Sequence, residues 1–231
     1  MAGRRIWRTS IKTLGKYVSE IVVLCEGKTE ELAVRHFIAR HWQADDFGSV
    51  GLKRINLRGK LENVGKFATR HLDQKDVLAV FTLVDLQRMT RVVHPPEDNL
   101  ETKIERVQAW LRAQVNHARA GQFFPHVCVH QTEAWVLAEG YALAARLKDS
   151  GIAPDPNAEL KDFQNPPSNR LNELFLRFKS RRYNKTTDGQ PLLGAMQFQP
   201  VYSSCRHFRA FYDDLRAVAS SSPSSSQISK P

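Results

Sequence analysis

Two uninterrupted runs of five apolar residues, 21–25 and 77–81, constrain the fold more than any other feature of this sequence. Each run suits a buried strand, and each is far shorter than the roughly 20 apolar residues that a membrane-spanning helix needs. Continuous apolar strands are typical of parallel sheets, whose two faces are both covered by helices. The runs therefore predict an α/β protein and exclude a membrane protein.

Strand and helix patterns alternate along most of the chain. Because such alternation is typical of crossover connections, it predicts a mostly parallel four-stranded sheet with helices on both faces and a C-terminal helical extension. We expect a basic N-terminal arm (1–19), an α/β core (20–150), a helical extension packed on the core (151–219) and a disordered Ser-rich tail (220–231). The predicted strands are 20–25, 52–57, 77–85 and 126–130, and the predicted helices are 29–42, 62–73, 100–120, 133–148, 169–178 and 205–217.

Positive charge is concentrated in two short segments. The chain has 34 Lys and Arg residues against 24 Asp and Glu residues, a net charge of +10 that favours a polyanionic partner. Residues 1–20 hold five Lys or Arg against one Glu, and residues 168–185 hold six against one. Phosphate contact and ordinary solvated surface are both open interpretations. The residues of the second segment that we expect to contact nucleic acid, DNA rather than RNA, are Arg177, Lys179, Arg181, Arg182 and Lys185.

The cysteines and histidines do not form a recognisable metal motif. Three scattered cysteines are too few for a disulfide framework and fit a reducing, cytoplasmic location. His126, Cys128 and His130 alternate along one predicted strand, so they share a face and could present soft ligands. Since no second ligand cluster accompanies them, we interpret them as packing residues. Gly27-Lys28-Thr29 resembles the end of a nucleotide-binding loop, but the earlier glycine that such a loop requires is missing.

Carboxylates follow three of the predicted strands. Glu26 follows the first strand, Asp85 ends the third, Glu133 follows the fourth, and Glu30 lies one helical turn beyond Glu26. The carboxyl ends of parallel strands meet at one edge of a sheet, where α/β proteins place their sites. Clustered carboxylates repel one another unless a cation compensates, and hard oxygen ligands suit Mg²⁺ or Mn²⁺. The alternative is that the glutamates stabilise helix N-termini, which explains Glu26 least well because it directly follows the apolar run.

Several motifs resemble a known family. Residues 21–31, in which a glutamate and a glycine follow an apolar strand, resemble the opening motif of Toprim domains, especially the version in OLD-type nucleases, where a second glutamate lies one turn on. Asp85 takes the place of the Toprim aspartate. Over residues 21–215, the order and spacing of the motifs resemble those of a family of small, uncharacterised bacterial Toprim-like proteins. The further motifs are His130-Gln131-Thr132-Glu133-Ala134-Trp135, Tyr183-Asn184-Lys185 and Cys205-Arg206-His207-Phe208.

The resemblance implies a metal-dependent nuclease, often one that works beside an ABC-type or AAA-type ATPase in defence against phage. It implies that Glu26, Glu30, Asp85 and Glu133 hold one or two Mg²⁺ or Mn²⁺ ions. Glu26, Asp85, Glu133 and Lys185 would then be catalytic, with Lys185 neutralising charge that develops on the phosphate.

Two positions depart from the family pattern. Gln87 stands where Toprim domains usually have a second aspartate, and Gln131 stands where a glutamate is more common. Either change could weaken a second metal ion. A non-catalytic subunit that binds nucleic acid or an ATPase is therefore the main alternative, and an RNA-processing or primase-like role is a third.

Overall fold

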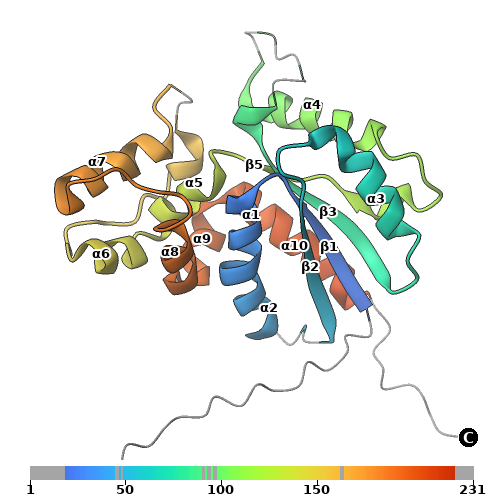
Figure 1. The fold of residues 1–231 in the computed structure, drawn as a ribbon, viewed down its shortest axis with the longest axis horizontal. Helices are drawn as coiled ribbons and strands as arrows, with labels where there is room; N and C mark the ends of the chain where they lie inside the picture. Colours follow the sequence, from blue (N-terminus) through green and yellow to red (C-terminus); the bar gives the residue numbers. More distant parts are fainter. Residues whose placement is uncertain are drawn as a thin grey trace, which may run out of the picture.

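The structure is a computed structural model that describes residues 19–44, 47, 49–89, 92, 95, 98–161 and 164–221. The predicted N-terminal arm before Ser19 and the predicted tail after Ser221 lie outside the described residues. In the part that is described, a parallel sheet lies between two layers of helices, and a group of shorter helices extends to one side (Figure 1). The predicted α/β class is confirmed.

The sheet is built on two long central strands. β1 (Ser19–Cys25) pairs in parallel with β2 (Val50–Asn56) on one side and with β3 (Val77–Asp85) on the other. The short strands β4 (Phe123–Phe124) and β5 (Val127–Cys128) both pair in parallel with β3, so the order is β2-β1-β3-β4, with β5 beside the end of β3. The carboxyl ends of β1, β3 and β5 therefore lie at one edge of the sheet.

The fourth predicted strand, 126–130, differs from what the structure contains. Instead of one strand there are two short ones, and over the described residues the sheet has five strands rather than four. Pro125 separates them, because proline has no N–H to give to a strand ladder. His126 gives its N–H to Oγ1 of Thr82 on β3 (3.0 Å) instead of to a backbone carbonyl. A side chain thus replaces the ladder hydrogen bond at the break.

Alternate residues of β1 enter two separate cores. Ile21 and Val23 pack with the continuous helical segment made of α1 (Lys28–Ala33), a π-helical turn (Val34–Ile38) and α2 (Ala39–Ala44), and with α10 (Arg206–Ser220). Val22 and Leu24 pack with α3 (Val64–Leu72) and α4 (Leu100–Ala113) on the opposite face. This alternation is what a strand buried on both faces requires.

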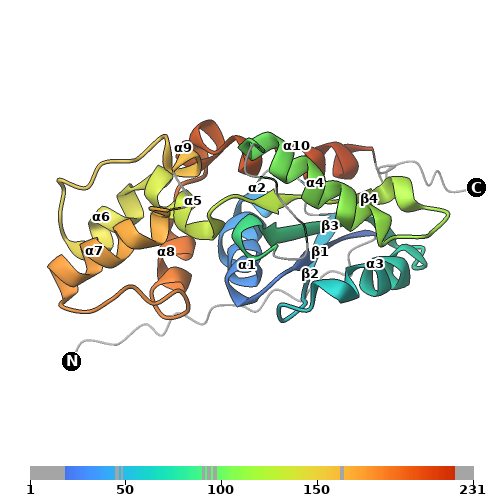
Figure 2. The ribbon, with the colours of Figure 1, turned by 90° about the horizontal axis from the view of Figure 1, so that it is seen from above.

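The remaining helices lie beside the sheet (Figure 2). The predicted helix 133–148 is broken at Gly140, whose φ of +67° is in the region that favours glycine. A Cβ there would come within 2.7 Å of the backbone of Pro154, so glycine also permits a close approach. The helices of this group are α5 (Gln131–Glu139), α6 (Tyr141–Leu147), α7 (Pro167–Lys179), α8 (Gly189–Ala195) and α9 (Phe198–Ser204). Single 3₁₀ turns are Leu61–Asn63, Leu86–Arg88, Ala120–Gln122 and Ala158–Leu160.

Two further findings concern the classes considered from the sequence. No helix among the described residues is both long enough and apolar enough to cross a membrane. Cys25, Cys128 and Cys205 are all buried and have free thiols, as packing residues would.

Candidate functional site

Glu26 and Asp85 are in direct contact at the carboxyl edge of the sheet. The N–H of Asp85 donates to Oε2 of Glu26 (2.8 Å), and the N–H of Glu26 donates to the carbonyl of Leu83 (3.1 Å). The parallel register of β1 and β3, which pairs Cys25 with Leu83, brings the two residues to the same level. Glu26 is 2% exposed and Asp85 is 1% exposed. Glu26 and Asp85, which the sequence placed at the ends of separate strands, are thus buried neighbours.

Glu30 joins this pair from the first turn of α1. Its Oε2 accepts a hydrogen bond from the N–H of Gly27 (3.0 Å), so it stabilises the start of the helix as the alternative interpretation proposed. Burial raises the pKa of Glu30 to about 7, and the charges of Glu26 and Asp85 add to the rise. Since a neighbouring negative charge acts on a pKa only at short range, Glu30 belongs to the same electrostatic cluster.

Cys128 lies among these carboxylates. β5 pairs it with Asp85, and its side chain is buried. Burial raises the pKa of its thiol well above the usual value, and the charges of Glu30, Asp85, Glu159 and Glu133 add to this. The thiol is therefore protonated and serves as packing, which agrees with the interpretation made from the sequence.

Glu133 lies in the first turn of α5 and is 1% exposed. Its Oε1 is 2.8 Å from Nζ of Lys185, and its buried Oε2 meets no hydrogen-bond donor among the described residues. Burial raises the pKa of Glu133, the charge of Asp85 adds to the rise, and Lys185 opposes it. Lys185 was predicted to neutralise charge on a phosphate, and in the structure it forms an ion pair with Glu133.

The loop that carries Lys185 is fastened by a buried aspartate. Asp188 accepts two hydrogen bonds of 2.6 Å from the guanidinium of Arg181 and one from the N–H of Asn184 (3.0 Å). Its side chain is 1% exposed, and the pKa of the carboxyl is lowered, mainly by the bonds from Arg181. The sequence pattern did not single out Asp188, although an acid within a run of basic residues is a signal for such a pair.

The predicted nucleic-acid residues do not share one environment. Arg181 forms an ion pair with Asp188, and its guanidinium lies 5.3 Å from the ring centre of Phe175. The guanidinium of Arg177 lies 5.0 Å from the ring centre of Phe178. Arg177, Lys179, Arg182 and Lys185 have exposed positions on α7 and the following loop. Arg181 and Lys185 therefore differ from the other three because each already contacts a carboxylate, that of Asp188 and that of Glu133 respectively.

The alternating histidines, and Gln87 at one of the two departures from the family pattern, have distinct surroundings. Nε2 of His130 is 2.6 Å from the carbonyl of Lys161, and Nε2 of His126 is 3.0 Å from Oδ2 of Asp214. The two histidines thus have separate partners. Gln87 is exposed just after β3, and its N–H donates to Oδ1 of Asp85 (3.0 Å).

The carboxylates match a hard cation in their chemistry but are not arranged around one. Glu26, Glu30 and Asp85 supply the oxygen ligands that Mg²⁺ and Mn²⁺ prefer. As their side chains are placed, however, no group of three or more His, Cys, Asp or Glu among the described residues could hold a metal ion. A shared cation would require these side chains to turn toward one another. The predicted metal ligands therefore remain a proposal.

Comparison with known proteins places the chain in a family. The chain belongs to the family described as "Domain of unknown function (DUF4276)", whose family model matches residues 25–216. This confirms the resemblance to an uncharacterised family that the sequence motifs suggested. No curated protein matches the chain.

Solved structures with some similarity are those of the C-terminal region of the OLD protein of Xanthomonas campestris pv. campestris. The form phased with iodine is 16% identical, with a TM-score of 0.38 over 87% of this chain and 99% of that one. The form phased with mercury is 17% identical, with a TM-score of 0.36 over the same shares of the two chains.

Proposed function

We propose that the chain is a metal-dependent phosphodiester hydrolase, a nuclease of the Toprim type, whose site lies at the ends of β1 and β3. The observation that carries the proposal is the 2.8 Å hydrogen bond from the N–H of Asp85 to Glu26, with Glu30 close enough for both charges to raise its pKa. Three buried carboxylates repel one another when they are ionised, so a nearby positive charge would stabilise them. A divalent cation would supply that charge.

In this proposal each residue has a separate task. Glu26, Asp85 and Glu30 would bind Mg²⁺ or Mn²⁺, and Glu133 would join them if a second ion binds. The bound cation would polarise the phosphate and lower the pKa of an attacking water. Lys185 would neutralise negative charge on the phosphate once it leaves Glu133, and the Asp188–Arg181 pair would hold its loop in position.

The surrounding charge suits a nucleic-acid substrate. The exposed positions of Arg177, Lys179 and Arg182 lie on the same segment as Lys185, and phosphate groups attract such side chains without reading sequence. We propose DNA as the preferred substrate. Action beside an ABC-type or AAA-type ATPase, as in phage defence, is a further part of the proposal that rests on the family resemblance of the motifs.

A non-catalytic binding module is the second candidate. The observation that favours it is the ion pair between Lys185 and Glu133, because the protein here supplies its own cation to an acidic residue of the cluster. The exposed Gln87 in place of a second aspartate points the same way. Such a module would bind nucleic acid or an ATPase through its basic surface and would cleave nothing.

Cleavage assays separate the two candidates. The full chain would be incubated with plasmid, single-stranded DNA and RNA in Mg²⁺, in Mn²⁺ and in chelator. Glu26→Gln keeps an oxygen that can accept from the N–H of Asp85 but removes the charge a hard cation needs, so cleavage should fall at least a hundredfold without loss of thermal stability. Glu105→Gln, an exposed glutamate on α4, is the matched control. Equal cleavage by wild type and Glu26→Gln would contradict the proposal.

A further inference from the structure

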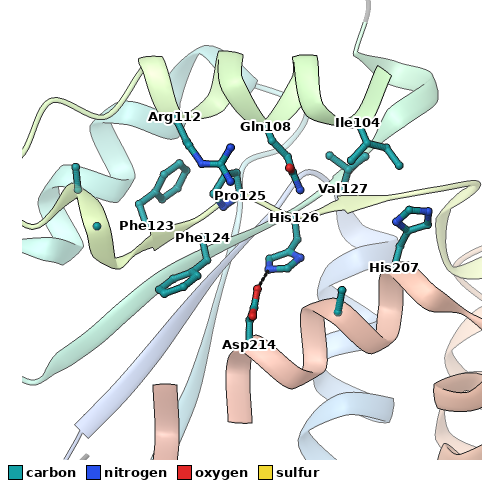
Figure 3. Close-up of a pocket in the computed structure, with 13 residues that line it drawn as sticks. Ile104, Gln108, Arg112, Phe123, Phe124, Pro125, His126, Val127, His207 and Asp214 are labelled. Carbon is teal, nitrogen blue, oxygen red and sulfur yellow. Dashed lines mark ion pairs between the residues drawn. The ribbon is translucent and has the colours of Figure 1, made fainter. Parts of the chain in front are cut away.

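A pocket of about 570 Å³ lies between α4 and α10, apart from the carboxylates described above (Figure 3). Its floor is the chain segment from Phe123 to Val127, which contains β4, Pro125 and the start of β5. Pockets of this volume are typical of small-molecule sites. Glu26, Glu30, Asp85 and Glu133 are absent from the described residues that line it.

Both α4 and α10 contribute one face to the lining of the pocket. Ile104, Gln108 and Arg112 are spaced by four residues on α4, so they lie along one face of that helix. His207 and Asp214 lie on the facing side of α10, and Figure 3 shows them opposite the α4 residues. The pocket therefore has one wall from each helix.

Contacts between α4, α10 and β3 hold the walls and floor of the pocket in place. The N-terminal ends of the two helices are linked, because Oε2 of Glu101 is 2.8 Å from Nη2 of Arg206 and its Oε1 is 3.7 Å from Nε2 of His207. The backbone of His126 is fixed by the two hydrogen bonds it shares with Thr82, at 3.0 and 3.1 Å. Walls held by such contacts lower the entropy cost of binding a ligand.

Beneath the floor, the fully buried ring of Phe81, which does not line the pocket, stacks on the rings of two lining residues. The rings of Phe81 and Phe124 are stacked with centres 4.8 Å apart and planes at 11°, and the ring of His126 lies 5.8 Å from Phe81 at 12°. Phe123, Pro125 and other apolar groups line the neighbouring surface. Flat apolar surfaces of this kind favour a planar ring system in the ligand.

Among the charged groups of the lining, Arg112 is the one that can pair with an anion. Asp214 is the carboxylate among the 13 residues drawn in Figure 3, and Nε2 of His126 lies 3.0 Å from it. Arg112 is exposed on α4, and its guanidinium is permanently charged. The amide of Gln108 and the ring of His207 can pair with heteroatoms of a ring. Nε2 of His207 is 3.7 Å from Oε1 of Glu101, which is beyond hydrogen-bond distance.

We propose that this pocket binds a mononucleotide unit, with the base against the apolar floor and the phosphate at Arg112. A nucleoside monophosphate combines the planar ring, the ring heteroatoms and the single anionic group that the lining addresses. The unit is either a free nucleotide or the 5′-phosphorylated end of a strand. The site is separate from the proposed nuclease site and does not depend on it.

Isothermal titration of the full chain in chelator tests the proposal, with the four 5′-mononucleotides as probes. At least one should bind about tenfold or more tightly than ribose 5-phosphate and than the matching nucleoside, because each of these lacks one half of the recognised chemistry. Arg112→Gln should weaken binding about tenfold or more, and Gln108→Trp should abolish it by filling the pocket. Arg216→Gln, an exposed arginine of α10 outside the lining, should bind as wild type does.

Several results would overturn the proposal: no binding of any nucleotide up to about 5 mM, equal binding of ribose 5-phosphate, or unchanged binding by Arg112→Gln at equal thermal stability. Glu26→Gln should leave nucleotide binding intact, so a failed nuclease proposal leaves this one standing. Competition by a 5′-phosphorylated oligonucleotide would assign the site to strand ends. Lack of competition would assign it to free nucleotides.

Discussion

Nζ of Lys185 lies 2.8 Å from Oε1 of Glu133, which joins the loop between α7 and α8 to the first turn of α5. The lysine side chain is 43% exposed and the glutamate side chain is 1% exposed. A buried carboxylate is thus neutralised by a cation that water can reach. Because the ion pair neutralises a buried charge, its loss should lower the stability of the fold. The position of the Lys185 loop should in turn depend on whether Glu133 is ionised.

Lys185→Met should therefore destabilise the protein more at high pH than at low pH. Burial raises the pKa of Glu133, so the population of its neutral form in the folded state increases as pH falls. A neutral Glu133 needs no cation, so the loss of Lys185 then lowers the free energy of unfolding less. At pH 8 the buried charge loses its partner, and the free energy of unfolding should drop by about 1–3 kcal/mol. Denaturant unfolding at pH 5 and pH 8 measures this.

Lys179→Met is the matched control for that prediction. Lys179 is exposed on α7 and also carries one positive charge, so its loss should change the free energy of unfolding by less than about 0.5 kcal/mol at either pH. An equal loss of stability by Lys185→Met at pH 5 and pH 8 would show that the ion pair is not its cause.

The central strands and the first carboxylates were predictable because their signals are local. The apolar run that ends at Asp85 gives a strand with the predicted bounds 77–85, and β1 begins one residue before its predicted start. Parallel strands end at the same edge, so the approach of Glu26 to Asp85 followed from chain order alone. By contrast, α8 and α9 were missed because each is seven residues long, and α8 contains Pro191 and Gly194. Such helices are fixed by packing rather than by pattern.

The long-range pairs could not be predicted from local patterns. Asp214 is on α10, far along the chain from His126, and their contact depends on how α10 returns to the sheet. Asp188 lies only seven residues from Arg181, but its burial depends on the packing of α8. The five basic residues were therefore predicted to contact nucleic acid as one set, although Arg181 and Lys185 are paired with carboxylates of the protein.

Asp188→Asn should loosen the loop that carries Lys185. The aspartate accepts bonds from Arg181 and from the N–H of Asn184, and hydrogen bonds to a buried charge contribute more than neutral ones. We expect the free energy of unfolding to fall by about 1–3 kcal/mol at pH 7. The pKa of Asp188 is lowered from 3.8, so its contribution is present above that pH and disappears as pH falls further. The cost of the substitution should accordingly shrink near pH 3.

Denaturant unfolding of Asp188→Asn, Arg181→Gln and the double variant checks this pair. Arg182→Gln is the control, since the neighbouring arginine side chain is exposed. Fully additive losses in the double variant would mean that the two side chains do not act together.

Nucleic-acid binding should distinguish the exposed basic residues from Arg181. If Arg177, Lys179 and Arg182 contact phosphates, replacing each by Gln should lower the slope of log K against log salt by up to about 1. Arg181→Gln should change that slope less, because its guanidinium is already paired with Asp188. Titrations of labelled single-stranded and duplex DNA at several salt concentrations measure the slopes. Identical slopes for wild type and the three variants would make this segment ordinary surface.

The pH dependence of stability tests whether Glu30 belongs to the carboxylate cluster. Burial and the charges of Glu26 and Asp85 raise the pKa of Glu30 from 4.5 to about 7. For an acid with a raised pKa in the folded state, the folded protein loses stability as pH rises from 4.5 to about 7, and the full cost persists above that. A shift of this size corresponds to up to about 3 kcal/mol. Glu30→Gln keeps an acceptor for the N–H of Gly27 without the charge, so it should escape that loss.

In chelator, the stability of Glu30→Gln relative to wild type should therefore rise between pH 5 and pH 8 by up to about 3 kcal/mol, as measured by denaturant unfolding. Glu105→Gln should show no such trend, because Glu105 is exposed. Adding Mg²⁺ at pH 8 should stabilise wild type more than Glu30→Gln, since a bound cation offsets the repulsion that the variant already lacks. Parallel stability curves for wild type and Glu30→Gln in chelator would remove Glu30 from the cluster. Equal stabilisation of the two proteins by Mg²⁺ would remove it from the proposed metal ligands.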